Sequence, residues 1–431
     1  MSPCFASLSS EKTMKFYKRG RASGAVLLMA VLGMLTAAVP AAPATAPRPA
    51  PVPMEPGTPE AFALRWGDDR QTQARMLREA VNPNGARVMV GSMLDAANRN
   101  ARTQNNTGCR NRATGSGGAL RGVPFAALYC LNSQDTTDDD WTPQGISGTE
   151  DAQPGAGTVD RHKAIVFSWH EGRPGGSGMG TRLSFLDTAT NRYIHALLVE
   201  PNEAGNDYDE VSVHAGGIVW YQNYIFVADN QRGIHVYDTT NLLQLARNPK
   251  ASTSPQCPTG RQPGPNGRYC GRGYDYLLPE IGRWNNPNSS TTRYDSMSLE
   301  RNPDDPSFAP VFITSEYRTS RVGQVVRWNN ADMTSFRGTI HPFRAWMQPV
   351  RYVQGAFSRS CYYFNTGGGG SGNRDLVIAN ASGNRTPKSQ IGGRGLQDLY
   401  WLRSVNQLWT LTEHAGEGNR VLYGVTRPAC P

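Results

Sequence analysis

The sequence of 431 residues contains only 7 cysteines and 7 histidines, and several familiar patterns are missing from it. It has no dense run of five or six lysines and arginines, which argues against a nucleic-acid partner. It has no C-x2-C pair, which argues against structural zinc. It has no G-x-S-x-G motif to support a serine hydrolase. The glycine-rich stretch 367–373 lacks the Lys and Ser/Thr of a phosphate-binding loop.

The N-terminal residues 1–46 have the pattern of a secretory signal peptide. Cations within residues 12–21 precede an apolar stretch at 25–39, and A-x-A patterns follow at 42–46. The apolar stretch is shorter than the roughly 20 residues that a membrane helix needs, and no cysteine follows it as in a lipoprotein. Removing this segment lowers the formal net charge from +9 to +5, which is mild for this length. We therefore expect a secreted protein that does not stay in the membrane.

Six of the 7 cysteines follow the predicted signal peptide. An even number of cysteines in an exported chain predicts disulfide bonds. The plausible local pairs are Cys109–Cys130, Cys257–Cys270 and Cys361–Cys430. The first two would staple loops rich in glycine and arginine, and the third would tie the C-terminus back to the fold.

The rest of the chain divides by composition into three parts. Residues 47–60 form a proline-rich, extended spacer. Residues 61–140 are predicted to form a short extension, with a helix over 68–81 followed by an irregular region pinned by a disulfide. Residues 141–431 carry short runs of β-branched and aromatic residues between Gly, Asn, Asp and Pro clusters, which is typical of an all-β domain.

A weak repeat suggests the architecture of this all-β part. Each copy opens on a polar residue beside a small one, and after most openings comes an apolar strand that ends in polar residues. The openings lie at 143–147, 214–218, 294–298, 353–357 and 396–400. A sheet-sized unit repeated several times predicts a β-propeller, with five blades, six being the alternative count.

The second copy of the repeat is the clearest. Residues 251–270 interrupt it as a loop insertion, and 277–284 (LLPEIGRW) is predicted to be its outer strand. The segment 223–241 (NYIFVADNQRGIHVYDTTN) resembles the propeller repeats of many secreted bacterial proteins, with the pattern "lyVAD…G…VyD". This resemblance covers about three blades recognisably, and it implies a fold and no activity.

In a propeller, the starts of the first strands and the ends of the second strands meet on one face of the disk, around the channel where ligands usually bind. The openings would bring to this channel face Gln144, His214, Asp295, Gln354, Gln397 and Asp398. The loops would add His170, Glu171, Asp229, Asn230, Arg232, Glu316, Tyr317, Arg318, Glu413 and His414. The same residue types also pin strands together in propellers, so a structural role is the alternative for each, and the glycines beside His214 would let neighbouring strands approach closely.

Such a face suits an enzyme, either a lyase or a hydrolase, acting on an extracellular saccharide. A histidine could serve as general base, Tyr317 or a carboxylate as acid, and an arginine could neutralise an acidic sugar; hydrolysis would instead need two carboxylates. The catalytic candidates are His214, His170, His414, Tyr317, Glu316 and Asp295. The candidates for binding substrate are Gln144, Arg232, Arg318, Gln354, Gln397 and Asp398.

Two other functions remain open from the sequence. One is a non-catalytic propeller that binds a carbohydrate or a protein. The other is a metal-dependent hydrolase of small molecules, for which Asp229, Asn230 and Glu413 offer oxygen ligands suited to calcium. The sequence determines neither the substrate nor the oligomeric state.

Overall fold

The computed structural model describes residues 50–153, 155–172, 179–264, 267–305, 307–367, 372–381 and 387–431. The predicted signal peptide, with its A-x-A patterns at 42–46, lies outside the described residues. Residues 368–371 of the glycine-rich stretch lie outside them as well. Residues 1–48 separate from a second compact unit, Pro49–Pro431, and only the second unit is treated below.

Within the described residues, the fold is all-β, with a 13-stranded sheet, a 5-stranded sheet, two 4-stranded sheets and a small 3-stranded sheet. Their antiparallel runs form five groups of four strands, which we call units, and the first two units are joined in the 13-stranded sheet by the parallel pair of β8 and β17. The first comprises β5 (Trp141–Gly148), β6 (Ala164–Glu171), β7 (Thr181–Asp187) and β8 (Arg192–Pro201). The second comprises β10 (Ile218–Tyr221), β11 (Tyr224–Asp229), β12 (Gly233–Asp238) and β17 (Tyr276–Asn285). The third comprises β18 (Ser296–Glu300), β19 (Val311–Ser315), β20 (Gln324–Asn329) and β22 (Arg344–Met347). The fourth comprises β23 (Val353–Arg359), β24 (Cys361–Thr366), β25 (Arg374–Ala379) and β26 (Lys388–Gly392), and the fifth comprises β27 (Tyr400–Leu402), β28 (Gln407–Leu411), β29 (Val421–Thr426) and β4 (Ala127–Cys130).

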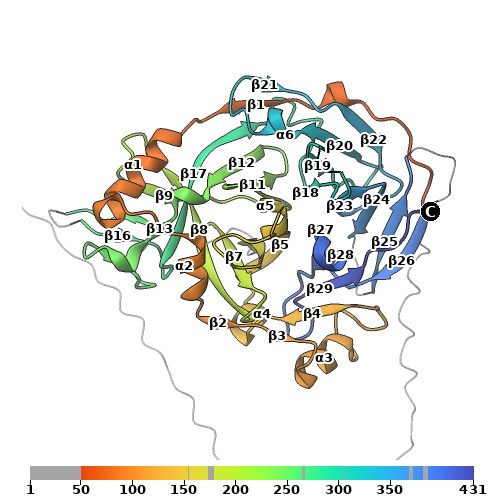
Figure 1. The fold of residues 1–431 in the computed structure, drawn as a ribbon, viewed down its shortest axis with the longest axis horizontal. Coiled ribbons are helices and arrows are strands. Elements are labelled where there is room, and N and C mark those ends of the chain that lie inside the picture. The colour runs from red at the N-terminus through yellow and green to blue at the C-terminus, as the bar shows by residue number, and fades with distance from the viewer. Residues whose placement is uncertain are drawn as a thin grey trace, which may run out of the picture. The chain divides into compact units, whose positions relative to one another are not determined.

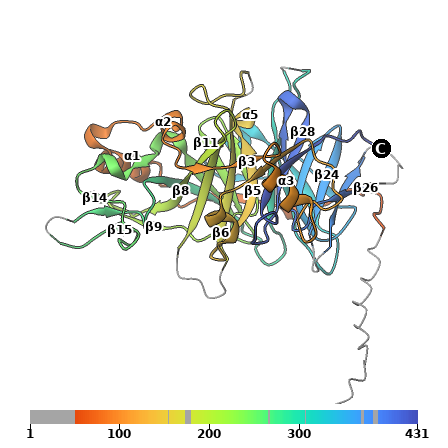
Figure 2. The ribbon, with the colours of Figure 1, turned by 90° about the horizontal axis from the view of Figure 1, so that it is seen from below.

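The first strands of these units contact one another around a common centre. Strand β5 contacts β10, β10 contacts β18, β18 contacts β23, and β5 also contacts β27 and β28. The fourth unit is joined to the fifth by Asn365, whose Nδ2 donates to the main-chain oxygen of Gln397 at 2.7 Å. Figure 1 shows these strands near the middle and β22 and β26 at the periphery, and Figure 2 shows the strands running roughly along the viewing direction of Figure 1. The arrangement is propeller-like.

The fifth unit is completed by a strand from the other end of the sequence. Strand β4 pairs antiparallel with β29, with Cys130 opposite Val421. Strand β1 (Leu64–Gly67) likewise joins the second unit by pairing with β17. Residues 61–140, expected as an extension in front of the sheets, therefore supply strands to two of them. The predicted outer strand at 277–284 is confirmed as part of β17, which pairs with β12.

The remaining elements are short and lie between or beside these units. The helices are α1 (Gln71–Val81), α2 (Val90–Asp95), α3 (Thr107–Thr114), α4 (Ser133–Thr137), α5 (Thr149–Ala152) and α6 (Asn330–Met333), with 3-10 turns at Pro59–Ala61, Pro83–Gly85, Thr239–Asn241, Leu245–Arg247 and Arg403–Val405. The minor strands are β2 (Arg99–Asn100), β3 (Arg102–Thr103), β9 (Tyr208–Glu210), β13 (Leu243–Gln244), β14 (Ala251–Ser252), β15 (Gly260–Arg261), β16 (Tyr269–Cys270) and β21 (Thr339–Ile340). Strands β14, β16 and β15 form a small sheet in the predicted insertion 251–270.

The predicted helix over 68–81 is confirmed, but it begins at Gln71. Asp68 has a positive φ of 49°, which is incompatible with a right-handed helix. The buried stripe consists of Ala74, Leu77 and Val81, spaced three and four residues apart. Met76 is exposed because it lies off that face.

Glycine allows the first strands of neighbouring units to come very close. A Cβ atom on Gly216 would lie 2.1 Å from the main-chain oxygen of Asp295, and one on Gly217 would lie 2.0 Å from the nitrogen of Met297. No side chain fits in either place. The expected close approach beside His214 is therefore confirmed.

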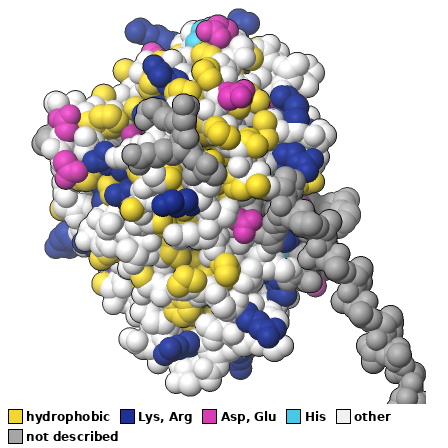
Figure 3. Space-filling model, turned by 90° about the vertical axis from the view of Figure 1, so that its right-hand side faces the viewer, with side chains coloured by type: hydrophobic (Ala, Val, Ile, Leu, Met, Phe, Trp, Pro, Cys, Tyr) yellow, Lys and Arg dark blue, Asp and Glu magenta, His cyan; other side chains and the backbone are white. Residues whose placement is uncertain are grey.

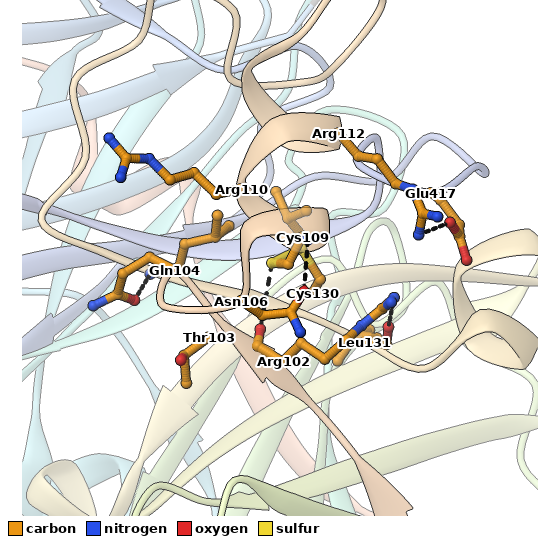
Figure 4. The surroundings of a disulfide bond; sticks show 12 residues. Arg102, Thr103, Gln104, Asn106, Cys109, Arg110, Arg112, Cys130, Leu131 and Glu417 are labelled. Atoms are coloured by element: carbon orange, nitrogen blue, oxygen red, sulfur yellow. Dashed lines mark hydrogen bonds and ion pairs between the residues drawn. A yellow bond between two sulfur atoms is a disulfide. The ribbon is translucent and has the colours of Figure 1, made fainter.

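All three predicted disulfides are present: Cys109–Cys130, Cys257–Cys270 and Cys361–Cys430. Figure 4 shows the first of them between α3 and β4, where Asn106 caps the helix by accepting the main-chain N–H of Cys109 at 2.9 Å and Arg112 pairs with Glu417. These bonds are compatible with an extracellular protein.

The surface that carries the fourth unit is mixed in character. Figure 3 shows Lys and Arg side chains scattered among hydrophobic and uncharged ones on this face, and not gathered in one patch. In the part of the chain that the structure describes, no helix is long and apolar enough to span a membrane.

Candidate functional site

Strand register brings the predicted residues to one end of the units. Trp141 at the start of β5 pairs with Glu171 at the end of β6, and Ser296 at the start of β18 pairs with Ser315 at the end of β19. The same alternation holds in the other units, so the openings and the loops after the second strands share one end. We call this end the channel face.

A cavity of about 440 Å³ lies on the channel face between the first and second units. Its lining is polar, and it consists of His170, Glu171, Ser212, Val213, His214, Asp229, Asn230, Gln231 and Arg232. We call it the rim cavity. Sequence reasoning placed six of these residues together, and it missed Ser212, Val213 and Gln231, whose side chains carry no motif.

Two histidines face each other in the rim cavity. The ring centroids of His170 and His214 are 4.7 Å apart, with the planes tilted by 41°. Burial, with a contribution from His214, lowers the pKa of His170 to about 3. Burial also lowers the pKa of His214, although Asp229 opposes that shift. Both imidazoles are therefore neutral near pH 7, and among the described residues the buried Nδ1 of His170 has no hydrogen-bond partner.

Asp229, at the edge of the rim cavity, is held as an anion by two cations. Its Oδ2 lies 2.5 Å from Nε of Arg232 and 3.5 Å from Nε2 of His235, and its Oδ1 accepts the main-chain N–H of His214 at 3.4 Å. Burial raises the pKa of Asp229, but hydrogen bonding to His235 and the charges of His235 and Arg232 outweigh it, so the pKa lies below its ordinary value.

His235 was given no role by sequence reasoning, yet it lies between two buried carboxylates. Its Nδ1 is 3.2 Å from Oε2 of Glu280, whose side chain is fully buried, and its Nε2 faces Asp229. Burial lowers the pKa of His235, but Glu280 and Asp229 more than compensate and raise it to about 9. The signal available in the sequence was a histidine inside an apolar strand, which needs a buried partner.

A second group of polar residues gathers toward the fifth unit. The Nε2 of Gln144 donates to Oε2 of Glu413 at 3.4 Å, and Oδ2 of Asp295 accepts the main-chain N–H of Tyr317 at 2.7 Å. Burial, Tyr352 and then the negative charges of Glu413 and Asp295 raise the pKa of Tyr317. Tyr317 therefore interacts electrostatically with Asp295 of its own unit and with Glu413 of the fifth unit. We call Gln144, Asp295, Tyr317 and Glu413 the carboxyl cluster.

Both acids of the carboxyl cluster hold their protons more tightly than usual. Burial raises the pKa of Asp295 to about 7, against the hydrogen bond from Tyr317 and the charge of Arg293. Burial also raises the pKa of Glu413, against the hydrogen bond from Gln144 and the charge of Arg374. A carboxyl group with a pKa of about 7, such as that of Asp295, can give up or take up a proton near neutral pH.

Other candidates are buried and serve the framework. Glu316 is 1% exposed, and its carboxylate binds Arg318 at 2.5 Å and accepts the main-chain N–H of Gln324 at 3.0 Å. Asp398 and Gln397 are 0% and 1% exposed.

Three further candidates reach the channel face but stay outside the carboxyl cluster. His414 is exposed, although its ring is partly buried. This partial burial, followed by the charges of three arginines, lowers its pKa. Gln354 is half-buried against Gly367. Arg232 is exposed, and besides Asp229 it binds the main-chain oxygen of Ser212 at 2.8 Å.

Away from the channel face, the first unit contains a serine, a histidine and an aspartate in hydrogen-bonded order. Ser184 Oγ lies 2.7 Å from Nδ1 of His195, and Nε2 of His195 lies 3.1 Å from Oδ1 of Asp135. The Ser184 side chain is fully buried, and its oxygen already accepts the indole N–H of Trp169 at 2.7 Å. Burial lowers the pKa of His195 to about 3. The group therefore cross-links strands and is not accessible to substrate.

The three residues considered for calcium are not gathered. Asp229 and Asn230 line the rim cavity, whereas Glu413 binds Gln144. Across the described ranges, no group of three or more His, Cys, Asp or Glu side chains is spaced to hold a metal ion.

No protein-family model and no curated protein matches the chain. Three solved structures are similar to it at a low level. Hydrazine synthase of Kuenenia stuttgartiensis is 9% identical over 64% of this chain and 74% of its own, with a TM-score of 0.31. A glucose dehydrogenase is 12% identical over 63% and 80%, with a TM-score of 0.28. The WD40 repeats of RRP9 are 9% identical over 65% and 79%, with a TM-score of 0.23. Scores of this size carry no conclusion about activity, and the class that the fold itself defines is a disulfide-bonded, all-β, propeller-like protein.

Proposed function

We propose that the five antiparallel units are the blades of a secreted β-propeller. Contacts between first strands link the units in a ring, and β4 from the N-terminal side completes the last unit. Such a joint between distant parts of the chain closes the ring and leaves few free sheet edges. The three disulfides and the pattern of residues 1–46 support export.

We further propose that the channel face binds an extracellular saccharide and hydrolyses it by acid–base chemistry. The observation that carries this proposal is the carboxyl cluster. In it, the negative charges of Asp295 and Glu413, from two different blades, both raise the pKa of Tyr317. Glycoside hydrolysis needs two carboxyl groups with different protonation states around one bond. Asp295, with a pKa of about 7, is assigned as the acid that protonates the leaving oxygen, and Glu413 as the base or nucleophile.

This assignment changes the roles expected for the histidines. A base whose conjugate acid has a pKa of about 3, as for His170, is too weak to remove a proton from a sugar carbon. The neutral rings of His170 and His214 are instead suited to hydrogen-bond sugar hydroxyls. The low pKa of His170 therefore supports hydrolysis over the lyase reaction that the sequence left open.

The test is release of reducing ends from a panel of neutral and acidic polysaccharides by the mature chain. We expect Glu413→Gln and Asp295→Asn to lose at least about 100-fold in kcat while circular dichroism stays unchanged. Glu203→Gln and Asp304→Asn, which change exposed carboxylates elsewhere, serve as matched controls. Full activity in either cluster variant would remove that residue from the reaction, and no release from any polymer would remove hydrolysis of the panel substrates.

A non-catalytic binding protein is the second candidate, and one observation favours it. The rim cavity presents two neutral histidines and a buried Nδ1 without a partner among the described residues, which suits recognition of hydroxyl groups. In that case oligosaccharide binding, measured by calorimetry, weakens in His170→Ala and is unchanged in Glu413→Gln, and no turnover accompanies it. The metal-dependent alternative has no grouping of donors in its favour.

A further inference from the structure

A second cavity lies at the end of the units opposite the channel face. At this end Gly148 pairs with Ile165, Tyr221 with Tyr224 and Glu300 with Val311. The cavity measures about 700 Å³. Four of the five units contribute to its lining, which includes Glu150, Lys163, Tyr221, Arg301, Phe308 and Arg403. We call it the rear cavity.

Arg301 is the unusual residue of the rear cavity. It is only 7% exposed, and its Nη2 donates a hydrogen bond to the main-chain oxygen of Asp151 at 2.5 Å, not to a carboxylate. Its Nε has no partner among the described residues, and its guanidinium lies 5.3 Å from the ring centre of Tyr221. A buried guanidinium is ordinarily paired with an anion, because an unpaired buried charge is costly.

The acids around the rear cavity do not supply that anion. The Oε2 atom of Glu150 accepts the main-chain N–H groups of Arg403 and Ser404, at 2.6 Å and 3.1 Å, and lies 3.8 Å from Nε of Arg403. Asp151 binds Ser147 at 3.0 Å, and burial raises its pKa to about 7, so near neutral pH it is only partly charged. Glu150 is therefore balanced by Arg403, and Asp151 is a weak counter-charge for Arg301.

The remaining charges leave the rear cavity positive. Lys163 lines it and is exposed. Asp305, the other acid of the lining, uses Oδ1 to accept the main-chain N–H and the hydroxyl of Ser307 at 3.0 Å and 2.6 Å. Apolar walls are formed by Tyr221 and Phe308, with prolines beside them. The cavity thus combines one buried, unpaired cation, one exposed cation and apolar surface.

We propose that the rear cavity binds a small organic anion. Its oxyanion group is held by Arg301 with support from Lys163, and its organic part packs against Tyr221 and Phe308. A guanidinium binds carboxylate and phosphate oxygens through several N–H donors, and desolvation inside a cavity strengthens such bonds. This site shares no residue with the channel face and does not depend on saccharide hydrolysis.

Isothermal titration calorimetry on the mature chain at constant ionic strength tests the proposal. The probes are benzoate, phenyl phosphate, inorganic phosphate and the uncharged benzamide. We expect benzoate or phenyl phosphate to bind at least about 10-fold more tightly than benzamide and than inorganic phosphate. We expect Arg301→Gln to weaken that binding at least about 10-fold and Lys163→Gln to weaken it a few-fold. Inorganic phosphate binding as tightly as the organic probes would reduce the site to a simple anion site and overturn the organic class.

The control is Arg344→Gln, which removes an exposed arginine beside Trp346 on strand β22, outside the lining of the rear cavity. No binding of any anion by the wild type overturns the proposal, and so does an equal loss in Arg344→Gln and Arg301→Gln. If Arg301→Gln does not fold, it is replaced by Arg301→Lys, which keeps the charge but loses the Nε–H donor. Undiminished affinity in both Arg301→Lys and Lys163→Gln would then overturn the assignment. Because the readout is heat of binding, failure of saccharide hydrolysis leaves this result unaffected.

Discussion

The Oδ2 atom of Asp398 accepts the main-chain N–H of Ile146 at 3.2 Å, although 252 positions separate the two residues. The same oxygen accepts the N–H of Ile218 at 3.2 Å. The main-chain N–H groups of Met297 and Leu399 also hydrogen-bond to the carboxyl group and lower its pKa. One buried side chain therefore links the first strands of the first, second, third and fifth units. Burial nevertheless raises the pKa of Asp398 well above its ordinary value.

Replacing Asp398 tests how much this central link stabilises the ring. Asp398→Ala leaves several buried N–H groups without an acceptor, so we expect a loss of about 3 kcal/mol in the free energy of unfolding. Asp398→Asn keeps one acceptor oxygen and should cost less. Urea unfolding of both variants measures the difference. Equal stability of wild type and Asp398→Ala would show that the central bonds are not needed.

The buried His235 predicts a loss of stability at alkaline pH. Its pKa is about 9 in the folded chain and about 6.5 in an unfolded one. The raised value means that its contribution is complete below pH 6.5 and is lost as the pH rises through 9. The upper bound on this contribution is about 3 kcal/mol. Urea unfolding at pH 6.5 and 9.5 should show a fall that is smaller in His235→Gln and unchanged in His341→Gln, which alters an exposed histidine.

The assignment of Asp295 as the acid predicts the pH dependence of the reaction. Its carboxyl group must be protonated to act, and its pKa is about 7. The rate kcat should therefore fall as the pH rises through about 7, and this limb should be absent from the residual activity of Asp295→Asn. A limb near pH 7 that persists in the variant would assign the titration to another group.

The chain of Ser184, His195 and Asp135 should matter for stability and not for activity. Ser184→Ala removes the acceptor of the buried Trp169 indole and the partner of His195, so we expect a loss of about 2 kcal/mol. Activity per folded molecule should stay unchanged, and a fluorophosphonate probe should not label Ser184 in the native protein. Labelling at Ser184 would show that the serine is reachable after all.

The disulfide between Cys361 and Cys430 should contribute strongly to the free energy of unfolding, because it closes the longest loop of the three. Its two cysteines are 69 positions apart in sequence. The loop-entropy relation gives about 4 kcal/mol for a loop of this length. The double variant Cys361→Ser, Cys430→Ser should therefore unfold at lower urea concentration than Cys257→Ser, Cys270→Ser, whose loop spans 13. The reverse order would mean that the C-terminal tie is not a main constraint.

Much of the fold could be read from local sequence. Apolar runs such as 224–229, bounded by turn residues, predicted strands that the structure confirms, and the repeated openings fall at the first strands of the five units. Cysteine spacing made three local pairs plausible without settling the connectivity, and the structure forms those three pairs. What local sequence did not show is that β4, at Ala127–Cys130, pairs with β29 almost 300 residues later. Pairing between strands so distant leaves no periodic signal.

The candidate site shows the same division. The sequence by itself determined which polar residues come to one end of the units, because strand direction alternates with each turn. Only the tertiary structure decided which of them can meet a ligand. Asp398 and Glu413 follow the same pattern in the fifth unit, yet Asp398 is enclosed by main-chain donors of other units, while Glu413 lies beside Gln144 and raises the pKa of Tyr317. Burial and pKa depend on neighbours supplied by distant units, and those neighbours are set only when the units pack together.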